Sequence, residues 1–371
     1  MVYITRVQLF FLIMLFEIGS TTLFALGIKA KQDAWIVVLI ASFIGLGLVW
    51  VFTQFPKFYP NKNFSDILDS TIGRKLAIPL LFIYSAYFLS GASFNFYEFS
   101  ELIKVTALPL TPRIIILYLF IIVTAYILTL GFEVLARMAE ILLPVFITFL
   151  ILIYIITMFS GHFNIRALLP VLGNGLKPIL GKTLVEVVTF PFGELVVFIM
   201  FWHFVRKQEQ IRKVSLFAIA LSTFFIIFSL IVLISMLGPE LAANSAIPLL
   251  HVLLAINIAD IITNVDLLAI LVIFIGGFFK MSLHFYGAVL AVTWIFKIKD
   301  PKWVIVVLGL LFPIYNIFRF DNIIYHRWLG SEVHWFVMVM IILMTVLLLI
   351  VIFLKHKSET SKQRRERDVN S

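Results

Sequence analysis

Long apolar segments recur along the whole 371-residue chain, and they limit the possible fold more than any other feature. A helix needs about 20 apolar residues to cross the hydrocarbon core of a bilayer. Hydrophobic residues make up 62% of the chain and charged residues only 13%, which excludes an ordinary soluble domain. The segments are continuously apolar rather than alternating, which argues against a membrane β-barrel. We therefore predict an all-α polytopic membrane protein.

Ten segments are predicted to span the membrane, and they divide into two sets of five. The spans are residues 6–28, 34–56, 78–103, 112–131, 139–160, 183–205, 214–237, 263–296, 303–318 and 333–354. An odd number of spans in each set makes the first half, 6–160, and the second half, 183–354, inverted repeats. The chain 1–371 is thus predicted to be one transmembrane domain that ends in a tail, 355–371.

The distribution of lysine and arginine predicts the orientation. With the N-terminus in the cytoplasm, 19 of these residues fall on the inner side and nine on the outer side. Basic residues favour the cytoplasmic side, so both termini are predicted to be cytoplasmic. This topology also explains the net charge of +9 without any nucleic-acid partner.

Two loop segments carry predictions of their own. The polar tail, 355–371, has mixed charge and is expected to be solvated and disordered. The outer segment 248–258 is apolar but too short to span. We expect it to form a helix at the outer rim or over the entrance of a cavity.

The first span of each half is interrupted near its middle. Residues 19–22, "GSTT", break the apolar pattern of span 6–28, and residues 190–194, "FPFGE", break that of span 183–205. A proline cannot donate a backbone hydrogen bond, and irregular backbone at membrane depth survives only where it lines protein or a wet cavity. Each break also exposes free N–H and C=O groups that suit a small zwitterion. The matching positions favour a binding site over two unrelated kinks.

Four ionisable side chains lie within predicted spans, where such groups are costly and normally face the protein interior. They are Glu17, Glu98, Glu194 and Lys280. Glu194 follows the second break, where it either caps the outgoing half-helix or contacts a ligand. Glu17 precedes the first break at a helix C-terminal end, so it should be protonated or paired. Lys280 either replaces a bound cation or carries a proton, or else forms a structural ion pair with Glu17 or Glu194.

The polar and small residues around the two breaks form the candidate site. The candidate ligand-binding residues are Gly19, Ser20, Thr21, Thr22, Asn95, Glu98, Phe190, Pro191, Phe192, Gly193, Glu194, Gly277 and Lys280. Glu17 and Lys280 are the candidates for ion or proton coupling, or for a structural pair. We find no catalytic constellation, no nucleotide-binding motif and no metal spacing among the seven histidines. The sequence therefore predicts no enzyme, no metal and no cofactor.

The motifs in three of the spans resemble those of a known family. "EIGSTT" in the first span, "FPFGE" in the sixth and "GGFFKMS" in the eighth, with the ten-span outline, look like the permease-like B subunit of GerA-type spore germinant receptors. That family belongs to the amino acid–polyamine–organocation superfamily, and the resemblance implies the LeuT-like five-plus-five inverted fold. It also implies that both breaks fall where the superfamily holds its ligand. Lys280 falls on the helix that carries a cation site in sodium-coupled relatives, so its charge argues against sodium at that place.

The resemblance further implies a nutrient sensor in the inner membrane of bacterial spores. Such a subunit binds a small germinant, an amino acid or a sugar, and works with an A-type membrane subunit and a C-type lipoprotein. A proton-coupled amino-acid permease with the same fold is the alternative, because both functions need the same pocket. A purely scaffolding subunit is a third and weaker alternative, since it would not need buried charges.

Overall fold

The computed structural model describes residues 3–245, 247–254 and 266–369. The regular secondary structure of these residues is helical, apart from one isolated backbone bridge. The first half contains α1 (Arg6–Thr21), η1 (Ile28–Asp33), α2 (Ala34–Phe52), α3 (Phe55–Phe58), α4 (Phe64–Ile72), α5 (Arg74–Thr106), α6 (Arg113–Leu130) and α7 (Phe132–Met158). The connection to the second half contains η2 (Ile165–Leu168) and α8 (Lys177–Leu180). The second half contains α9 (Lys182–Thr189), η3 (Phe192–Met200), η4 (Trp202–Phe204), η5 (Gln208–Gln210), α10 (Ile211–Asn244), α11 (Pro248–Leu254), α12 (Asp266–Ile295), α13 (Pro301–Arg319), α14 (Ile323–Trp328), η6 (Leu329–His334) and α15 (Trp335–Val369).

Nine helical segments of the described chain are long and apolar enough to cross a membrane. They are Ile28–Phe58, Arg74–Thr106, Arg113–Leu130, Phe132–Met158, Lys182–Met200, Gln208–Asn244, Ile270–Ile295, Pro301–Arg319 and Ile323–Ser358. Helix α1 has only 16 residues, because it ends at Thr21 inside the predicted first span. The prediction of a polytopic all-α membrane protein is confirmed, while the count of ten spans and the division into inverted repeats stay predictions.

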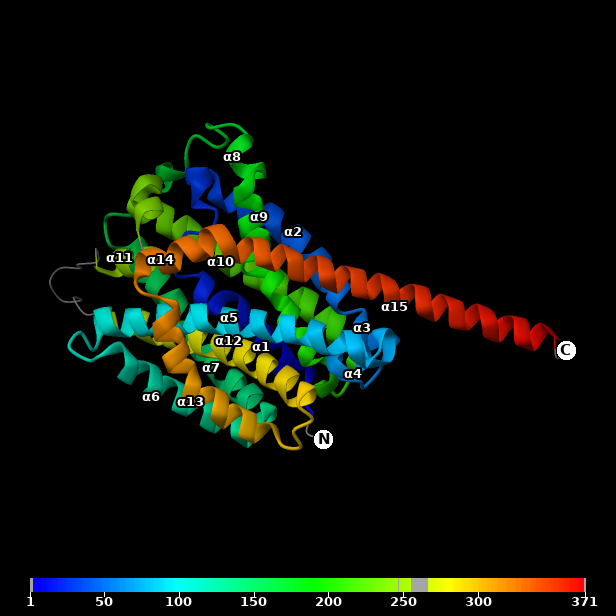
Figure 1. The fold of residues 1–371 in the computed structure, drawn as a ribbon. Helices are drawn as coiled ribbons and strands as arrows, with labels where there is room; N and C mark the ends of the chain where they lie inside the picture. Colours follow the sequence, from blue (N-terminus) through cyan, green and yellow to red (C-terminus); the bar gives the residue numbers. More distant parts are fainter. Residues whose placement is uncertain (1–2, 246, 255–265, 370–371) are drawn as a thin grey trace.

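Helices α1, α5 and α12 pack together in the middle of the molecule (Figure 1). Helix α10 packs against α1 and α2, and α13 packs against α6. The closest approach is between Gly19 of α1 and Gly276 of α12, where a Cβ atom on either glycine would overlap the backbone of the other. Glycines have no side chain, so the two backbones can come this close. Such close packing favours helix association in a membrane. The contact places the end of α1 directly against α12.

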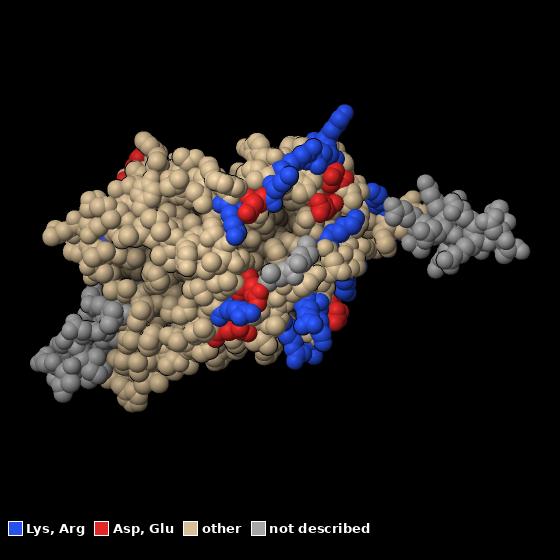
Figure 2. All heavy atoms as spheres, turned by 90° about the horizontal axis from the view of Figure 1, so that it is seen from below, with Lys and Arg blue, Asp and Glu red and all other residues tan. Residues whose placement is uncertain are grey.

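Both chain termini lie at the same end of the molecule as α3 and α4 (Figure 1). Figure 2 shows Lys and Arg side chains, interspersed with Asp and Glu, gathered over this end, while most of the remaining face carries no charge. This arrangement is typical of a membrane protein whose charged residues lie in loops beyond the bilayer. Which end faces the cytoplasm stays a prediction.

The C-terminal tail differs from the expectation of disorder. Helix α15 continues without interruption to Val369 and projects away from the bundle (Figure 1). The prediction from low hydrophobicity was wrong because the tail extends an existing helix and therefore needs no new helix nucleus.

The outer segment forms the short helix α11, Pro248–Leu254, and Pro248 lies on the wall of the cavity described below. The rest of this predicted helix, and residues 263–265 of the predicted eighth span, lie outside the described residues.

Candidate functional site

At the end of α1, two threonine hydroxyl groups donate back to carbonyl oxygens of the same helix. Thr21 Oγ1 donates to the carbonyl oxygen of Glu17, and Thr22 Oγ1 donates to that of Ile18 at 3.0 Å. Ser229 Oγ of α10 donates to the carbonyl oxygen of Thr22 at 3.0 Å. The chain then continues through turns to η1. The hydroxyl protons of both threonines are therefore committed to the backbone, and these side chains stabilise the break.

The second interruption follows α9, which ends at Thr189. Phe190 is extended, with φ −131° and ψ 115°, and the chain resumes at Phe192 as the 3₁₀-helix η3. Pro191 has no N–H to continue the α-helical pattern. The backbone N–H of Glu194 donates to the carbonyl oxygen of Pro191 at 3.1 Å. The interruption lies within the "FPFGE" stretch, and its depth in the membrane stays a prediction.

Two residues of this stretch pack away from the cavity described below. Phe192 is fully buried against Gly45 of α2, where a Cβ would come within 2.7 Å of the phenylalanine side chain. A Cβ on Gly193 would lie 3.0 Å from Met338 and 3.1 Å from Ile342 of α15. Both residues thus fix the backbone of the interruption against neighbouring helices.

A buried ion pair joins the second interruption to α12. Lys280 Nζ lies 2.7 Å from Glu194 Oε2, and the two side chains are 0% and 3% exposed. His334 Nε2 lies 3.2 Å from the other oxygen, Glu194 Oε1. The ammonium group also lies 4.0 Å from the centre of the Phe190 ring and 5.2 Å from that of Phe16. A charge in such surroundings needs a partner, because burial removes its hydration.

The pairing of Lys280 answers a question that the sequence leaves open between Glu17 and Glu194. The structure pairs Lys280 with Glu194. Glu17 is fully buried, and neither of its carboxyl oxygens has a hydrogen-bond partner among the described residues. An unpaired carboxyl in an apolar environment is far cheaper to bury when protonated. Glu17 is therefore not the ionic partner of Lys280, and no hydrogen bond from a described residue stabilises its carboxyl group.

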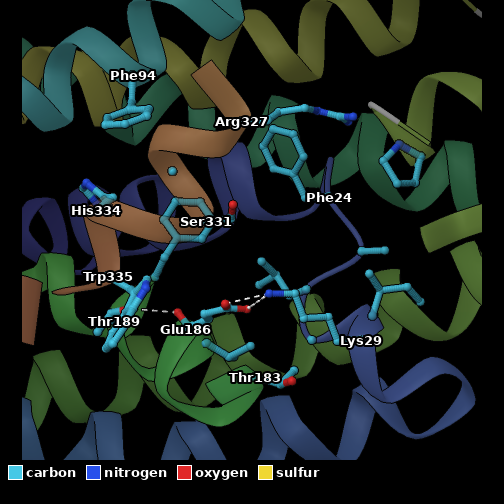
Figure 3. Close-up of a pocket in the computed structure, with 18 of the residues that line it drawn as sticks. Phe24, Lys29, Phe94, Thr183, Glu186, Thr189, Arg327, Ser331, His334 and Trp335 are labelled. Carbon is cyan, nitrogen blue, oxygen red and sulfur yellow. Dashed lines mark hydrogen bonds and ion pairs between the residues drawn. The ribbon is translucent and has the colours of Figure 1, made fainter. Parts of the chain in front are cut away.

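A cavity of about 330 Å³ lies next to this ion pair, between the segment that follows α1 and helices α5, α9 and α15. Figure 3 shows Phe94, His334 and Trp335 on one side of it and Phe24 and Arg327 on the other. The wall comprises Phe24, Ala25, Leu26, Gly27, Ile28, Lys29, Phe94, Asn95, Glu98, Thr183, Glu186, Val187, Thr189, Phe190, Glu194, Ala242, Ala243, Ser245, Pro248, His326, Arg327, Gly330, Ser331, His334 and Trp335. Its volume and its mixture of apolar and polar walls are those of a small-molecule site.

Two opposite charges on the cavity wall have no close ionic partner in the described chain. The contact of Glu98 within 4 Å is with His326, with 3.9 Å between Glu98 Oε1 and His326 Nε2, and the charges of Lys280 and Arg327 act on its carboxyl group from farther away. Arg327 Nη2 donates to the carbonyl oxygen of Ser245 at 3.0 Å and forms no ion pair among these residues. The cavity thus offers one acid and one base to a ligand that carries both charges.

Ion pairs lie on and beside the wall of the cavity. Lys29 Nζ lies 2.7 and 2.9 Å from the two carboxylate oxygens of Glu186, an interaction visible in Figure 3. Lys182 Nζ lies 2.7 Å from Glu332 Oε2 and 3.8 Å from Glu186 Oε1. These pairs connect three elements around the cavity: η1, α9 and η6. Ion pairs that are accessible to solvent contribute little to stability.

The structure brings part of the predicted site together. Asn95, Glu98, Phe190 and Glu194 line the cavity. Ser20 and Gly277 line a small adjoining space of about 20 Å³ that also touches Asn95 and Glu98. The remaining candidates support the site from behind; they are Gly19, Thr21, Thr22, Pro191, Phe192, Gly193 and Lys280.

Sequence reasoning missed the wall residues contributed by the end of the chain. Arg327, His334 and Trp335 lie at the start of the last span, far from either break in sequence. A search restricted to the two breaks could not find them. The one available signal was the run of polar and aromatic residues that precedes the last apolar segment.

These features define a class of protein: an all-helical, polytopic membrane protein with a ligand-sized cavity beside a buried ion pair. The fold is similar to MhsT in complex with L-phenylalanine, with a TM-score of 0.66 and 15% identity over 94% of this chain and 88% of that one. It is also similar to a Na⁺-coupled sialic acid symporter in a substrate-bound outward-open state, with a TM-score of 0.65 and 12% identity over 88% of this chain and 76% of the other. The predicted LeuT-like fold is thereby confirmed.

The sequence identifies the family. A profile of the family described as "Spore germination protein" matches residues 3–324. The chain is 32% identical to spore germination protein KB of Bacillus subtilis over 88% of this chain and 87% of that protein. It is 26% identical to spore germination protein YndE of the same species over 72% of this chain and 73% of that protein. The chain therefore belongs to the spore germination protein family, which confirms the resemblance drawn from its three motifs and the expectation that it is no enzyme.

Proposed function

We propose that this protein is the nutrient-sensing subunit of a spore germinant receptor, and that it binds a small zwitterionic germinant, such as an amino acid, in the 330 Å³ cavity. The observation that carries the proposal is the pair of opposite charges, Glu98 and Arg327, that face this cavity without close ionic partners in the described chain. Family membership supports the role in germination.

The proposed binding mode follows from the chemistry of the wall. The ligand ammonium contacts Glu98 and the ligand carboxylate contacts the Arg327 guanidinium, because charge-assisted hydrogen bonds are the strongest available. The ligand side chain contacts Phe190 and Trp335, which offer apolar area. The side-chain N–H group of Asn95 donates a hydrogen bond to the carbonyl oxygen of Gly91 at 2.9 Å. This bond orients the Asn95 amide at the cavity wall.

The same geometry suggests how binding reaches partner subunits. A ligand in the cavity contacts the segment after α1, the end of α9 and the start of α15 at once. Its binding therefore favours whichever arrangement of these elements it fits best, which is a shift between states. We propose that an A-type membrane subunit and a C-type lipoprotein sense this shift in the spore inner membrane.

The test is binding of radiolabelled amino acids to the purified full-length protein. Hydrogen bonds to charged groups contribute about 1.5–3 kcal/mol, so Glu98→Gln or Arg327→Gln should weaken binding roughly tenfold to a hundredfold. Glu209→Gln, a change of an exposed acid in η5 that lines no cavity, is the matched control. Unchanged affinity in both cavity variants would place the ligand elsewhere.

A proton-coupled amino-acid permease is the second candidate function. The observation in its favour is the fold similarity to a protein described as a Na⁺-coupled symporter. The buried Lys280–Glu194 pair would then carry the coupling charge. Proteoliposomes that contain only this protein distinguish the two functions: robust uptake driven by a proton gradient supports the permease and contradicts a purely sensing role.

A further inference from the structure

A groove of about 350 Å³ lies between α1 and α10 at the end of the molecule that carries both termini. It is separate from the germinant cavity and shares no residue with it. Its wall consists of Arg6, Val7, Phe10, Gln210, Lys213, Val214 and Phe217.

The floor of the groove is apolar and accessible. Phe10 and Phe217 stack with ring centres 5.6 Å apart and an interplanar angle of 24°. Phe217 is 64% exposed and Val7 is 45% exposed. Exposed apolar surface of this kind is suited to an acyl chain when it lies beside the bilayer.

The rim of the groove carries two basic side chains. Arg6 and Lys213 are both exposed, and neither forms an ion pair with any described residue. Helices α1 and α10 have no acidic residue in their first turns. Gln210 adds a buried side-chain oxygen, Oε1, that has no hydrogen-bond partner in the described chain. The rim therefore presents two cations and one free acceptor above an apolar floor.

We propose that this groove binds an anionic glycerophospholipid from the leaflet at the N-terminal end of the molecule. The lipid phosphate lies between Arg6 and Lys213, and one acyl chain lies over Phe10 and Phe217. A hydroxyl group of the lipid headgroup donates to Gln210 Oε1. Basic residues next to an apolar surface are the pattern that recognises anionic lipid.

The position of the groove gives such a lipid a structural consequence. Ile4, two residues before α1, is joined to the end of η4 and to the residues that follow it by two backbone hydrogen bonds: Ile4 N donates to Phe204 O at 2.7 Å and Arg206 N donates to Ile4 O at 3.1 Å. A lipid seated across α1 and α10 adds a further connection at the same place. It therefore stabilises the packed position of α1, the helix that carries Glu17 and the first break.

The experiment titrates the delipidated full-length protein with lipid in detergent. The apparent melting temperature of the protein is measured at each lipid concentration. The probes are phosphatidylglycerol, phosphatidylcholine and inorganic phosphate. Each basic residue near a membrane surface contributes enough that the double variant Arg6→Gln/Lys213→Gln should bind phosphatidylglycerol roughly thirtyfold more weakly. Wild-type protein should respond to phosphatidylglycerol at concentrations where phosphatidylcholine has no effect.

Two further variants make the result specific. Lys57→Gln/Lys302→Gln removes two exposed lysines that line no cavity and should leave the titration unchanged. Arg6→Lys/Lys213→Arg keeps both charges and should retain binding. An unchanged phosphatidylglycerol midpoint in Arg6→Gln/Lys213→Gln, or an equal response to phosphatidylcholine, overturns the proposal. An equal response to inorganic phosphate also overturns it, because the groove would then be a site for a soluble anion.

Discussion

Replacing Lys280 by methionine tests the buried centre of the molecule most directly. Methionine keeps most of the side-chain length between Phe190 and Phe16, but it removes the ammonium that lies 2.7 Å from Glu194 Oε2. Both members of the pair are almost completely buried, so solvent cannot replace the lost partner. Breaking such a pair from one side costs about 3–5 kcal/mol. The variant should therefore be strongly destabilised.

A second substitution separates the ion pair from simple packing. In Lys280→Met/Glu194→Gln the unpaired carboxylate is gone, while a neutral amide still reaches His334. Replacing both charges of a buried pair is often close to neutral, so the double variant should regain most of the lost stability. The coupling energy of this double-mutant cycle should exceed about 1 kcal/mol.

The measurement is the apparent melting temperature of the detergent-solubilised protein, read by fluorescence-detected size exclusion. About 2 °C per kcal/mol is expected for a large domain, so Lys280→Met should melt roughly 6–10 °C below the wild type. Lys302→Met, a change of an exposed lysine at the start of α13, is the matched control and should melt with the wild type.

Two results would refute this reasoning. The first is a Lys280→Met variant that melts with the wild type, which would mean that the ion pair contributes nothing. The second is a double variant that is no more stable than Lys280→Met, which would assign the whole loss to packing around the lysine stem.

Two other contacts give sharp predictions for the same assay. Gly276→Val should abolish monodisperse protein, because the new side chain overlaps the backbone of Gly19, whereas Gly309→Ala on α13 should be tolerated because its Cβ meets nothing closer than 3.7 Å. Asn316→Ala should lower the free energy of unfolding by about 1–3 kcal/mol. The buried Asn316 amide donates to Ser93 O at 2.8 Å and to Ser93 Oγ at 2.9 Å, and so joins α13 to α5. An unchanged melting temperature would show that this contact is dispensable.

Helices α1 and α9 end where the sequence predicts an interruption, because the cause of such a helix end is local. The "FPFGE" stretch contains a proline that cannot continue a helix, and α9 ends directly before it at Thr189. The first interruption was placed at residues 19–22, and α1 ends at Thr21. Local backbone chemistry determines the residue at which such a helix ends, independently of how the rest of the chain packs.

The sequence could not assign each side chain to the cavity or to its support. Thr21 and Thr22 looked available to a ligand, but their hydroxyls bond to the carbonyl oxygens of α1. Phe192 and Gly193 share the motif with Phe190 and Glu194, but Phe192 and Gly193 do not reach the cavity, whereas Phe190 and Glu194 do. Which way a side chain points after an interruption depends on the helices that pack around it.

The sequence by itself determined the class of this protein. Recurrent apolar segments require a helical membrane fold, because backbone polar groups in lipid must be satisfied within each segment. Three short motifs were sufficient to find the spore germination family, which the comparison with relatives confirmed.

Only the tertiary structure decided the pairing and the cavity. It paired Lys280 with Glu194 rather than Glu17, and it brought Arg327, from a distant part of the chain, to the same cavity as Glu98. These are contacts between residues far apart in sequence, and periodicity within a segment contains no information about them. The physical reason is that helix packing, here set by the approach of α1 to α12, fixes which buried charges meet.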